Sequence, residues 1–147
     1  MVSFAQAMPM MLRHAGIWDG VYRHVSFDFV LLDEHRMRTV CAFPDAGPYA
    51  YIQHNRLEWA DGRVEERDFP GVFDGTQLRW DTDRFHGYGW ETHGVVMLHL
   101  DRKDVVDAHF TEMIELSADG QRRARTWQWF EKGRPTRRTL CDEMRIG

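Results

Sequence analysis

The chain has 147 residues, a length that suits one domain with a single core. Its 19 Lys and Arg against 23 Asp and Glu give a formal net charge of −4. This balance, with no clustering of the basic residues, argues against nucleic acid or an anionic membrane as the main partner. Aromatic residues make up 13% of the chain and include six Trp, which indicates a core or a pocket built from large rings.

Cysteine use and hydropathy give an expectation for the compartment. Cys41 and Cys141 are the only cysteines, and no metal-ligand spacing joins them, although a disulfide is allowed by their number. The N-terminal residues lack a basic start before an apolar run, and no apolar stretch approaches the length of a membrane span. We therefore expect a cytoplasmic protein with reduced thiols.

The predicted elements are one short helix followed by strands. Pro9 suits a first helical turn and Gly16 suits a helix end, so the first fifteen residues predict a short helix. Beyond Gly16, β-branched and aromatic stretches alternate with turn signals such as Asp61-Gly62 and Asp119-Gly120. The predicted strands are Val21–Leu32, Arg36–Phe43, Tyr49–Trp59, Arg63–Phe69, Thr76–Asp81, Phe85–Glu91, Val95–Asp101, Val105–Leu116, Arg123–Lys132 and Thr136–Ile146.

Short hairpins with no second helix predict an all-β fold, an antiparallel up-and-down barrel of about eight to ten strands. Closure into a barrel removes the exposed edges that so long a meander would otherwise present. We expect residues 1–147 to form this single domain.

The turns also predict which side chains of the last five strands share a face. Hairpins centred on Ala118-Asp119 and on Arg134 place Glu112 opposite Arg125, and Arg125 opposite Glu143. A turn at Arg102-Lys103 adds the preceding strands to that face. We assign this more aromatic face to the interior, with the residues His86, Tyr88, Trp90, Val95, Met97, His99, Val106, Ala108, Phe110, Glu112, Ile114, Arg125, Trp127, Trp129, Thr139, Cys141 and Glu143.

Glu112, Arg125 and Glu143 form a row of charges on this face, and three interpretations remain. The row is a self-neutralising structural network, since a buried Arg is tolerated only when it is paired. Alternatively, the row orients a polar group of a ligand. In the third interpretation, burial raises the pKa of a carboxyl group such as Glu112, which then acts as a general acid or base.

The histidines add weaker candidates. His86 and His99 lie across one predicted hairpin beside Tyr88, but no metal-type His spacing supports a metal site, and we assign neither a metal nor a cofactor. His54 is a second candidate acid or base because imidazole titrates near neutral pH. The Gly-Tyr-Gly at Gly87–Gly89 lies inside a strand and indicates a bend or a close backbone approach.

The segment Gly16-Ile17-Trp18-Asp19-Gly20-Val21-Tyr22 after a short helix resembles the Gly-x-Trp opening of lipocalin-like (calycin) proteins. Gln53-His54-Asn55, Phe73-Asp74-Gly75 with Leu78-x-Trp80, and the Arg-rich last hairpin resemble bacterial calycin-like proteins of unknown function. The resemblance implies a barrel whose end is closed by Trp18 beneath a late-strand Arg, such as Arg125, Arg137, Arg138 or Arg145. It also implies that the barrel binds small apolar ligands, as members of that superfamily do. If Arg125 covers Trp18, the charged row is a lid for the closed end rather than a site.

The leading hypothesis is a barrel that binds a small, largely apolar or aromatic molecule in its interior. The predicted ligand-binding residues are His86, Tyr88, Trp90, His99, Phe110, Arg125, Trp127, Trp129 and Glu143. One alternative is a cofactor-free isomerase, lyase or hydratase that uses Glu112 or His54 as general acid or base. Another is a solid barrel that pairs with a partner through its outer face. A homodimer is compatible with the sequence.

Overall fold

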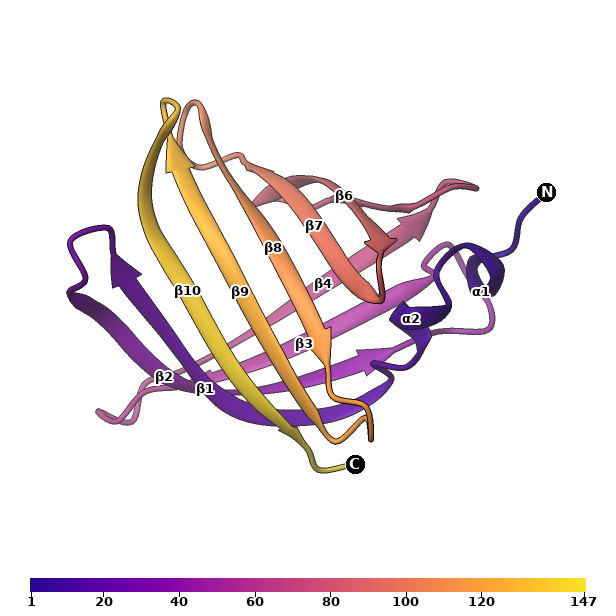
Figure 1. Ribbon diagram of the computed structural model, residues 1–147, viewed down its shortest axis with the longest axis horizontal. Helices are drawn as coiled ribbons and strands as arrows, with labels where there is room; N and C mark the ends of the chain where they lie inside the picture. Colours follow the sequence, from indigo (N-terminus) through magenta and orange to yellow (C-terminus); the bar gives the residue numbers. More distant parts are fainter.

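The computed structural model describes all 147 residues, and ten antiparallel strands close into a barrel (Figure 1). Each strand pairs with its neighbours in chain order, and β1 pairs with β10 to complete the ring. The all-β, up-and-down fold predicted from the turn signals is therefore confirmed. The strands are β1 Gly16–Ser26, β2 Leu31–Ala42, β3 Tyr51–Glu58, β4 Val64–Phe73, β5 Leu78–Asp81, β6 Phe85–Thr92, β7 Val95–Arg102, β8 Ala108–Leu116, β9 Arg122–Glu131 and β10 Arg134–Arg145.

Two four-residue helices, α1 Phe4–Ala7 and α2 Pro9–Leu12, lie against one end of the barrel (Figure 1). Met8 and Met11 are buried there, and the backbone N–H of Met11 donates to Glu91 Oε1 at 2.8 Å, which ties α2 to β6. These helices replace the single predicted helix. Gly16 begins β1 instead of ending a helix. Neither helix has the length or the apolar character needed to cross a membrane.

Trp18 closes the same end of the barrel, as the Gly-x-Trp resemblance implies. Its side chain is fully buried, and its Nε1–H donates to the carbonyl oxygen of His14 at 2.9 Å. The guanidinium carbon of Arg145 lies 4.5 Å from the centre of the indole ring, and that of Arg123 lies 4.7 Å from it. Trp18 is thus held between two cations, of which Arg145 was among the arginines proposed from sequence and Arg123 was not.

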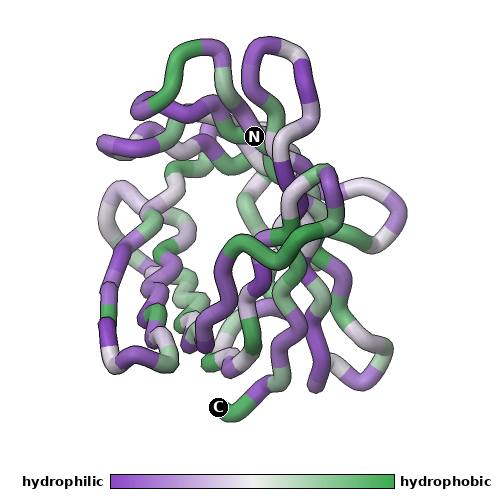
Figure 2. The backbone as a smooth tube through the Cα atoms, turned by 90° about the vertical axis from the view of Figure 1, so that its left-hand side faces the viewer, coloured by the Kyte–Doolittle hydropathy of each residue, from purple (hydrophilic) through white to green (hydrophobic).

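Hydrophilic and hydrophobic residues alternate along the strands, as expected for one face toward the core and one toward water (Figure 2). In β8, β9 and β10 the inward residues are those predicted, with Glu112, Arg125 and Glu143 among the buried side chains. The pairing differs by two residues, since Glu112 pairs with Trp127 and Arg125 pairs with Cys141. A shift of two positions keeps every side chain on its predicted face.

The predicted facing of β6 and β7 is wrong. His86, Tyr88, Trp90 and His99, together with Val95 and Met97, share the outer face, while Gly87, Gly89, Val96, Leu98 and Leu100 are buried. The cause lies between β7 and β8, where residues 103–107 form a five-residue connection in place of the predicted two-residue turn. Val106, predicted to be interior, is exposed in that loop.

Glycines on the inner face of β6 make room for a large ring from β5. An added Cβ at Gly89 would lie 2.8 Å from the ring of Trp80, and one at Gly71 of β4 would lie 2.9 Å from Trp80 Nε1. The close approach predicted for the Gly-x-Gly of β6 is therefore confirmed. It lets the fully buried Trp80 lie flat against the barrel wall.

The first hairpin turns earlier than predicted. Residues 27–30 connect β1 to β2. Asp33 and Glu34 lie inside β2, although they fall in the gap between the predicted strands Val21–Leu32 and Arg36–Phe43, where a turn was expected. Phe29 has a φ of 69° in this turn, and the large apolar side chains around it are exposed. This turn fixes the alternation of both strands, so that Tyr22, His24 and His35 face the interior.

Candidate functional site

The barrel encloses a cavity of about 470 Å³ that extends from α2 to the opposite end. A solid barrel is therefore excluded, and the volume is in the range of small-molecule sites. The wall carries nine aromatic side chains from both halves of the chain: Tyr22, Tyr51, Trp59, Phe69, Trp80, Phe85, Phe110, Trp127 and Trp129.

A buried ion network forms part of the floor. Arg125 Nε donates to Glu112 Oε2 at 2.9 Å, and Arg123 donates to both carboxylate oxygens of Glu143 at 2.9 and 3.0 Å. Arg125 Nη1 lies 3.7 Å from Glu143 Oε1, which joins the two pairs. Two carboxylates and two guanidiniums balance, so the network carries no net charge when all four groups are ionised. Burial raises the pKa of Glu112, against the opposing effect of Arg125.

The predicted row of charges is thus present, with Arg123 as a fourth member. Arg123 and Glu143 belong to the closed end, because Arg123 stacks on Trp18, and Glu143 does not line the cavity. Glu112 and Arg125 do line the cavity. Arg125 Nη1 is buried and makes no hydrogen bond, since its nearest carboxylate oxygen, Glu143 Oε1, is 3.7 Å away. The network is therefore both the lid of the closed end and part of the cavity floor.

The cavity opens to the side of the barrel between β4 and β5. Only Val72 and Phe73, at the end of β4, pair with β5. The earlier residues of β4 have no partner strand on that side, and the cavity lining there includes Arg67, Phe69 and the loop residue Arg84. The hydrogen-bond ladder of the barrel wall is therefore interrupted on this side of the cavity.

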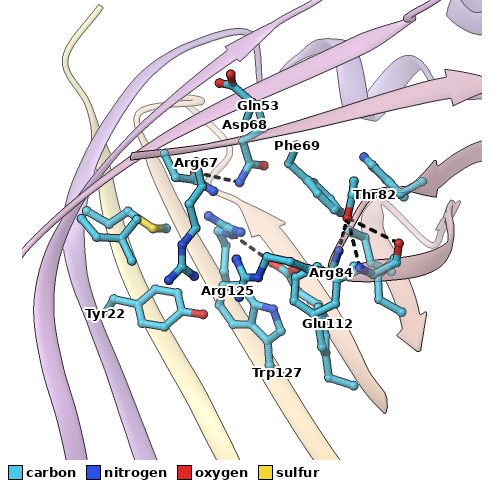
Figure 3. Close-up of a pocket in the computed structure, with 18 of the residues that line it drawn as sticks. Tyr22, Gln53, Arg67, Asp68, Phe69, Thr82, Arg84, Glu112, Arg125 and Trp127 are labelled. Atoms are coloured by element: carbon cyan, nitrogen blue, oxygen red, sulfur yellow. Dashed lines mark hydrogen bonds and ion pairs between the residues drawn. The ribbon is translucent and has the colours of Figure 1, made fainter. Parts of the chain in front are cut away.

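Besides Arg125, three arginines line the cavity, and two of them lie at this opening. Figure 3 shows Arg67 of β4 and Arg84 of the β5–β6 loop reaching into the cavity from its two sides, toward Tyr22. Arg67 is bound to Glu65, its neighbour on the same face of β4. Arg84 and Arg137 have no carboxylate within 4.0 Å, and Arg137 stacks on Trp129 at 4.3 Å.

A histidine with a free ring nitrogen also lines the cavity. His35 Nδ1 lies 2.9 Å from Asp33 Oδ2, and Asp33 Oδ1 accepts from Trp59 Nε1 at 2.9 Å. Although burial alone would raise it, hydrogen bonds from Trp59 and His35 lower the pKa of Asp33. Burial lowers the pKa of His35, so its imidazole is neutral at pH 7. Asp33 therefore holds the Nδ1–H tautomer, and Nε2 keeps its lone pair with no protein partner.

His24 lies near His35, with the two ring centres 6.3 Å apart. Its Nδ1 is 2.7 Å from Thr139 Oγ1, which also accepts from Trp129 Nε1 at 2.7 Å. Burial, and then the nearby charge of Arg137, lower the pKa of His24 to about 4. The interior imidazoles are therefore uncharged at neutral pH. No group of three His, Cys, Asp or Glu side chains is placed to hold a metal ion.

The structure brings together five of the predicted site residues: Glu112, Phe110, Arg125, Trp127 and Trp129 all line the cavity. The four that lie on the outer face of β6 and β7 do not line it, and neither does the buried Glu143. His54 also lies outside. It is half-exposed on β3 and contacts Asp68 at 2.6 Å. His54 therefore cannot act on a molecule held in the cavity.

The sequence-based prediction missed the cavity residues of the first half of the chain, among them Asp33, His35, Arg67 and Arg84. The alternation His35-x-Met37-x-Thr39-x-Cys41 was a usable signal, because all four side chains are buried. It could be used only with the first turn placed at residues 27–30. No periodicity marks Arg84, which lies in a loop.

No protein-family model matches this chain, and no curated protein matches it. Solved structures are similar to it in fold. The S-type phycobiliprotein lyase CPES from Guillardia theta aligns with a TM-score of 0.74 and 15% identity over 95% of this chain and 92% of its own. Rv2717c from M. tuberculosis aligns with a TM-score of 0.63 and 16% identity over 99% of this chain and 100% of its own.

A third similar structure is a protein of unknown function of the DUF3598 family from Nostoc punctiforme. It aligns with a TM-score of 0.67 and 17% identity over 92% of this chain, which spans 49% of that protein. All three likenesses are to ten-stranded antiparallel barrels and are consistent with a calycin-like fold. At these identities they establish the fold alone.

Proposed function

We propose that this protein is a calycin-type barrel that binds a small, largely aromatic or apolar molecule in its interior. The observation that carries the proposal is the cavity of about 470 Å³ with its nine aromatic lining residues and its lateral opening. Each large ring offers a flat apolar surface on which a planar ligand can stack. The name of the similar CPES, a phycobiliprotein lyase, supports a small-molecule partner for a barrel of this shape.

Native mass spectrometry of freshly purified protein tests the proposal first, by detecting a retained molecule that is released on unfolding. A fluorescence titration with two naphthalene probes follows: the neutral N-phenyl-1-naphthylamine and the anionic 1-anilinonaphthalene-8-sulfonate. We expect saturable binding at one site. Absence of a retained molecule together with failure of both probes to bind would overturn the proposal.

A matched pair of variants tests whether the probe binds inside the barrel. Leu98→Trp puts a large ring into the cavity, and Met97→Trp puts the same ring on the outer face of the same strand. We expect Leu98→Trp to weaken probe binding by about tenfold or more, the loss of roughly 1.4 kcal/mol, and Met97→Trp to leave it unchanged. Equal binding by the two variants would put the probe outside the barrel.

A second candidate function is proton transfer by His35, as in a cofactor-free isomerase, lyase or hydratase. It is favoured by the free Nε2, because a neutral imidazole oriented by Asp33 is a suitable general base. His35→Gln tests it. If His35 transfers a proton, the molecule retained by this variant should be the unreacted substrate, distinguishable from the molecule retained by the wild type. The same retained molecule in both proteins would argue against catalysis.

A further inference from the structure

The charged groups that line the cavity are unequally paired, and this bears on the class of the ligand. The lining contains five carboxylates, and all but Asp83 are engaged by protein groups: Asp33 by His35, Glu66 by Arg56, Asp68 by His54 and Glu112 by Arg125. Of the four lining guanidiniums, Arg67 is paired with Glu65 and Arg125 with Glu112, whereas Arg84 and Arg137 have no carboxylate within 4.0 Å. These two cations therefore have no protein counter-charge in contact.

Arg84 is the clearest case of a cavity cation without a counter-charge. Burial and the like charge of Arg67 both lower its pKa, while Asp104 and Asp83 oppose this only from a distance. Arg67 has Glu65 as its own counter-charge, whereas Arg84 has none, and an anion bound at Arg84 would supply it. Arg137 likewise has its pKa lowered by burial and then by the charge of Arg102, with no carboxylate in contact.

The aromatic wall lies directly beside these cations. Arg84 stacks on Phe85 at 4.9 Å and Arg137 on Trp129 at 4.3 Å, which keeps both guanidinium planes at the edge of the apolar surface. A guanidinium fixed in this way presents its N–H groups to a carboxylate or a similar oxyanion in a planar, two-bond geometry. The body of the ligand would then lie on Trp127 and Phe110, deeper in the barrel.

We propose that the ligand is an amphipathic anion, an aromatic body with at least one carboxylate, sulfonate or phosphate group, whose acidic group binds Arg84 at the cavity opening, while Arg137 is a second unpaired cation of the cavity wall. This inference rests on the proposed binding function and specifies its ligand. The free Nη1 of Arg125 offers a second, deeper donor to a carbonyl or carboxylate oxygen.

The two naphthalene probes separate this inference from the binding function itself, because they share one ring skeleton and differ by a sulfonate. We expect the anionic probe to bind the wild type about tenfold or more tightly than the neutral probe, since one charge-assisted contact of this kind is worth about that factor. The preference should shrink as salt is raised, because the opening is solvent-accessible. Equal affinities, or a preference for the neutral probe, would overturn the anion preference and leave the binding function standing. Failure of both probes would count against the binding function.

The double variant Arg84→Gln/Arg137→Gln should lose the preference while it retains the neutral probe within about twofold. The control is Arg122→Gln/Arg138→Gln, which removes the same charge from residues that do not line the cavity. Anion binding that falls equally in both double variants would overturn the assignment of these two arginines. If the first double variant does not fold, the salt dependence of the two probes on the wild type decides: dependence for the anionic probe alone supports the inference, and no difference refutes it.

Discussion

Replacing Glu112 by Gln should destabilise the fold strongly, because it leaves a buried guanidinium without its own counter-charge. The side chains of Glu112 and Arg125 are 3% and 5% exposed, so water cannot replace the lost carboxylate. Glu143 lies within 3.7 Å of Arg125, but both of its oxygens already accept hydrogen bonds from Arg123. Breaking a buried ion pair on one side costs about 3–5 kcal/mol. For a chain of this length that corresponds to a fall in melting temperature of about 10–15 °C.

Urea unfolding at pH 7, followed by Trp fluorescence, measures this loss. Glu115→Gln is the matched control, because Glu115 lies on the same strand but is exposed, and it should change the unfolding free energy by less than about 0.5 kcal/mol. The double variant Glu112→Gln/Arg125→Met removes both charges and should recover much of the stability.

Two results would refute this reasoning. One is a Glu112→Gln variant within about 1 kcal/mol of the wild type, which would mean that the buried charge of Arg125 is tolerated alone. The other is a double variant no more stable than the single one. Probe affinity is read in the same samples: unchanged affinity in folded Glu112→Gln assigns the carboxylate to stability, whereas a large loss assigns it to the ligand as well.

Two further perturbations follow from buried groups at the two ends of the barrel. Trp18→Ala removes the fully buried ring that closes one end and should cost about 3–5 kcal/mol of unfolding free energy; a melting temperature equal to that of the wild type would contradict the role of Trp18. Stability should also fall on acidification. Burial and Arg123 lower the pKa of His14 to about 3, and burial and Arg137 lower that of His24 to about 4. Both pKa values lie below the unfolded value of 6.5. As the pH falls through 6.5, the unfolded state therefore takes up protons that the folded state does not. The loss of stability continues until the pH reaches the folded pKa. Each histidine then removes about 2 kcal/mol between pH 7 and pH 5, and His24→Gln should remove about half of the combined effect; urea titrations that show equal stability at both pH values would exclude it.

The agreement between predicted and observed strands shows which structural features the local sequence determines. Turn residues such as Asp119-Gly120 favour a particular backbone conformation by themselves, so the number of strands and their up-and-down order could be predicted. The closed end was expected from the resemblance of the Gly-x-Trp segment to calycin proteins, and the full burial of Trp18 agrees with it. In β8 to β10 the predicted pairing was two residues off, yet the inward face was correct, because side-chain direction repeats every two residues.

The same periodicity explains the errors. The connection between β7 and β8 is five residues instead of two, and an odd difference inverts every side chain before it, from His86 to His99. Hydrophobicity could not correct this error, because both faces of β6 and β7 carry apolar residues. The inner face of β6 includes Gly87 and Gly89, which have no side chain that would mark a core position. Their role appears only when Trp80 of another strand packs against them.

The amino-acid sequence by itself determined an all-β chain of about eight to ten strands with an aromatic inner face, because strand propensity, turn chemistry and alternation act over a few residues. The Trp-closed end was expected from the resemblance to calycin proteins. Tertiary structure decided the rest of the site. It brought Trp59 to Asp33, left the first part of β4 without a partner, and set Arg67 and Arg84 on the two sides of the resulting opening. These contacts join residues whose distance depends on the closure and register of the whole barrel, and no local pattern in the sequence encodes that distance.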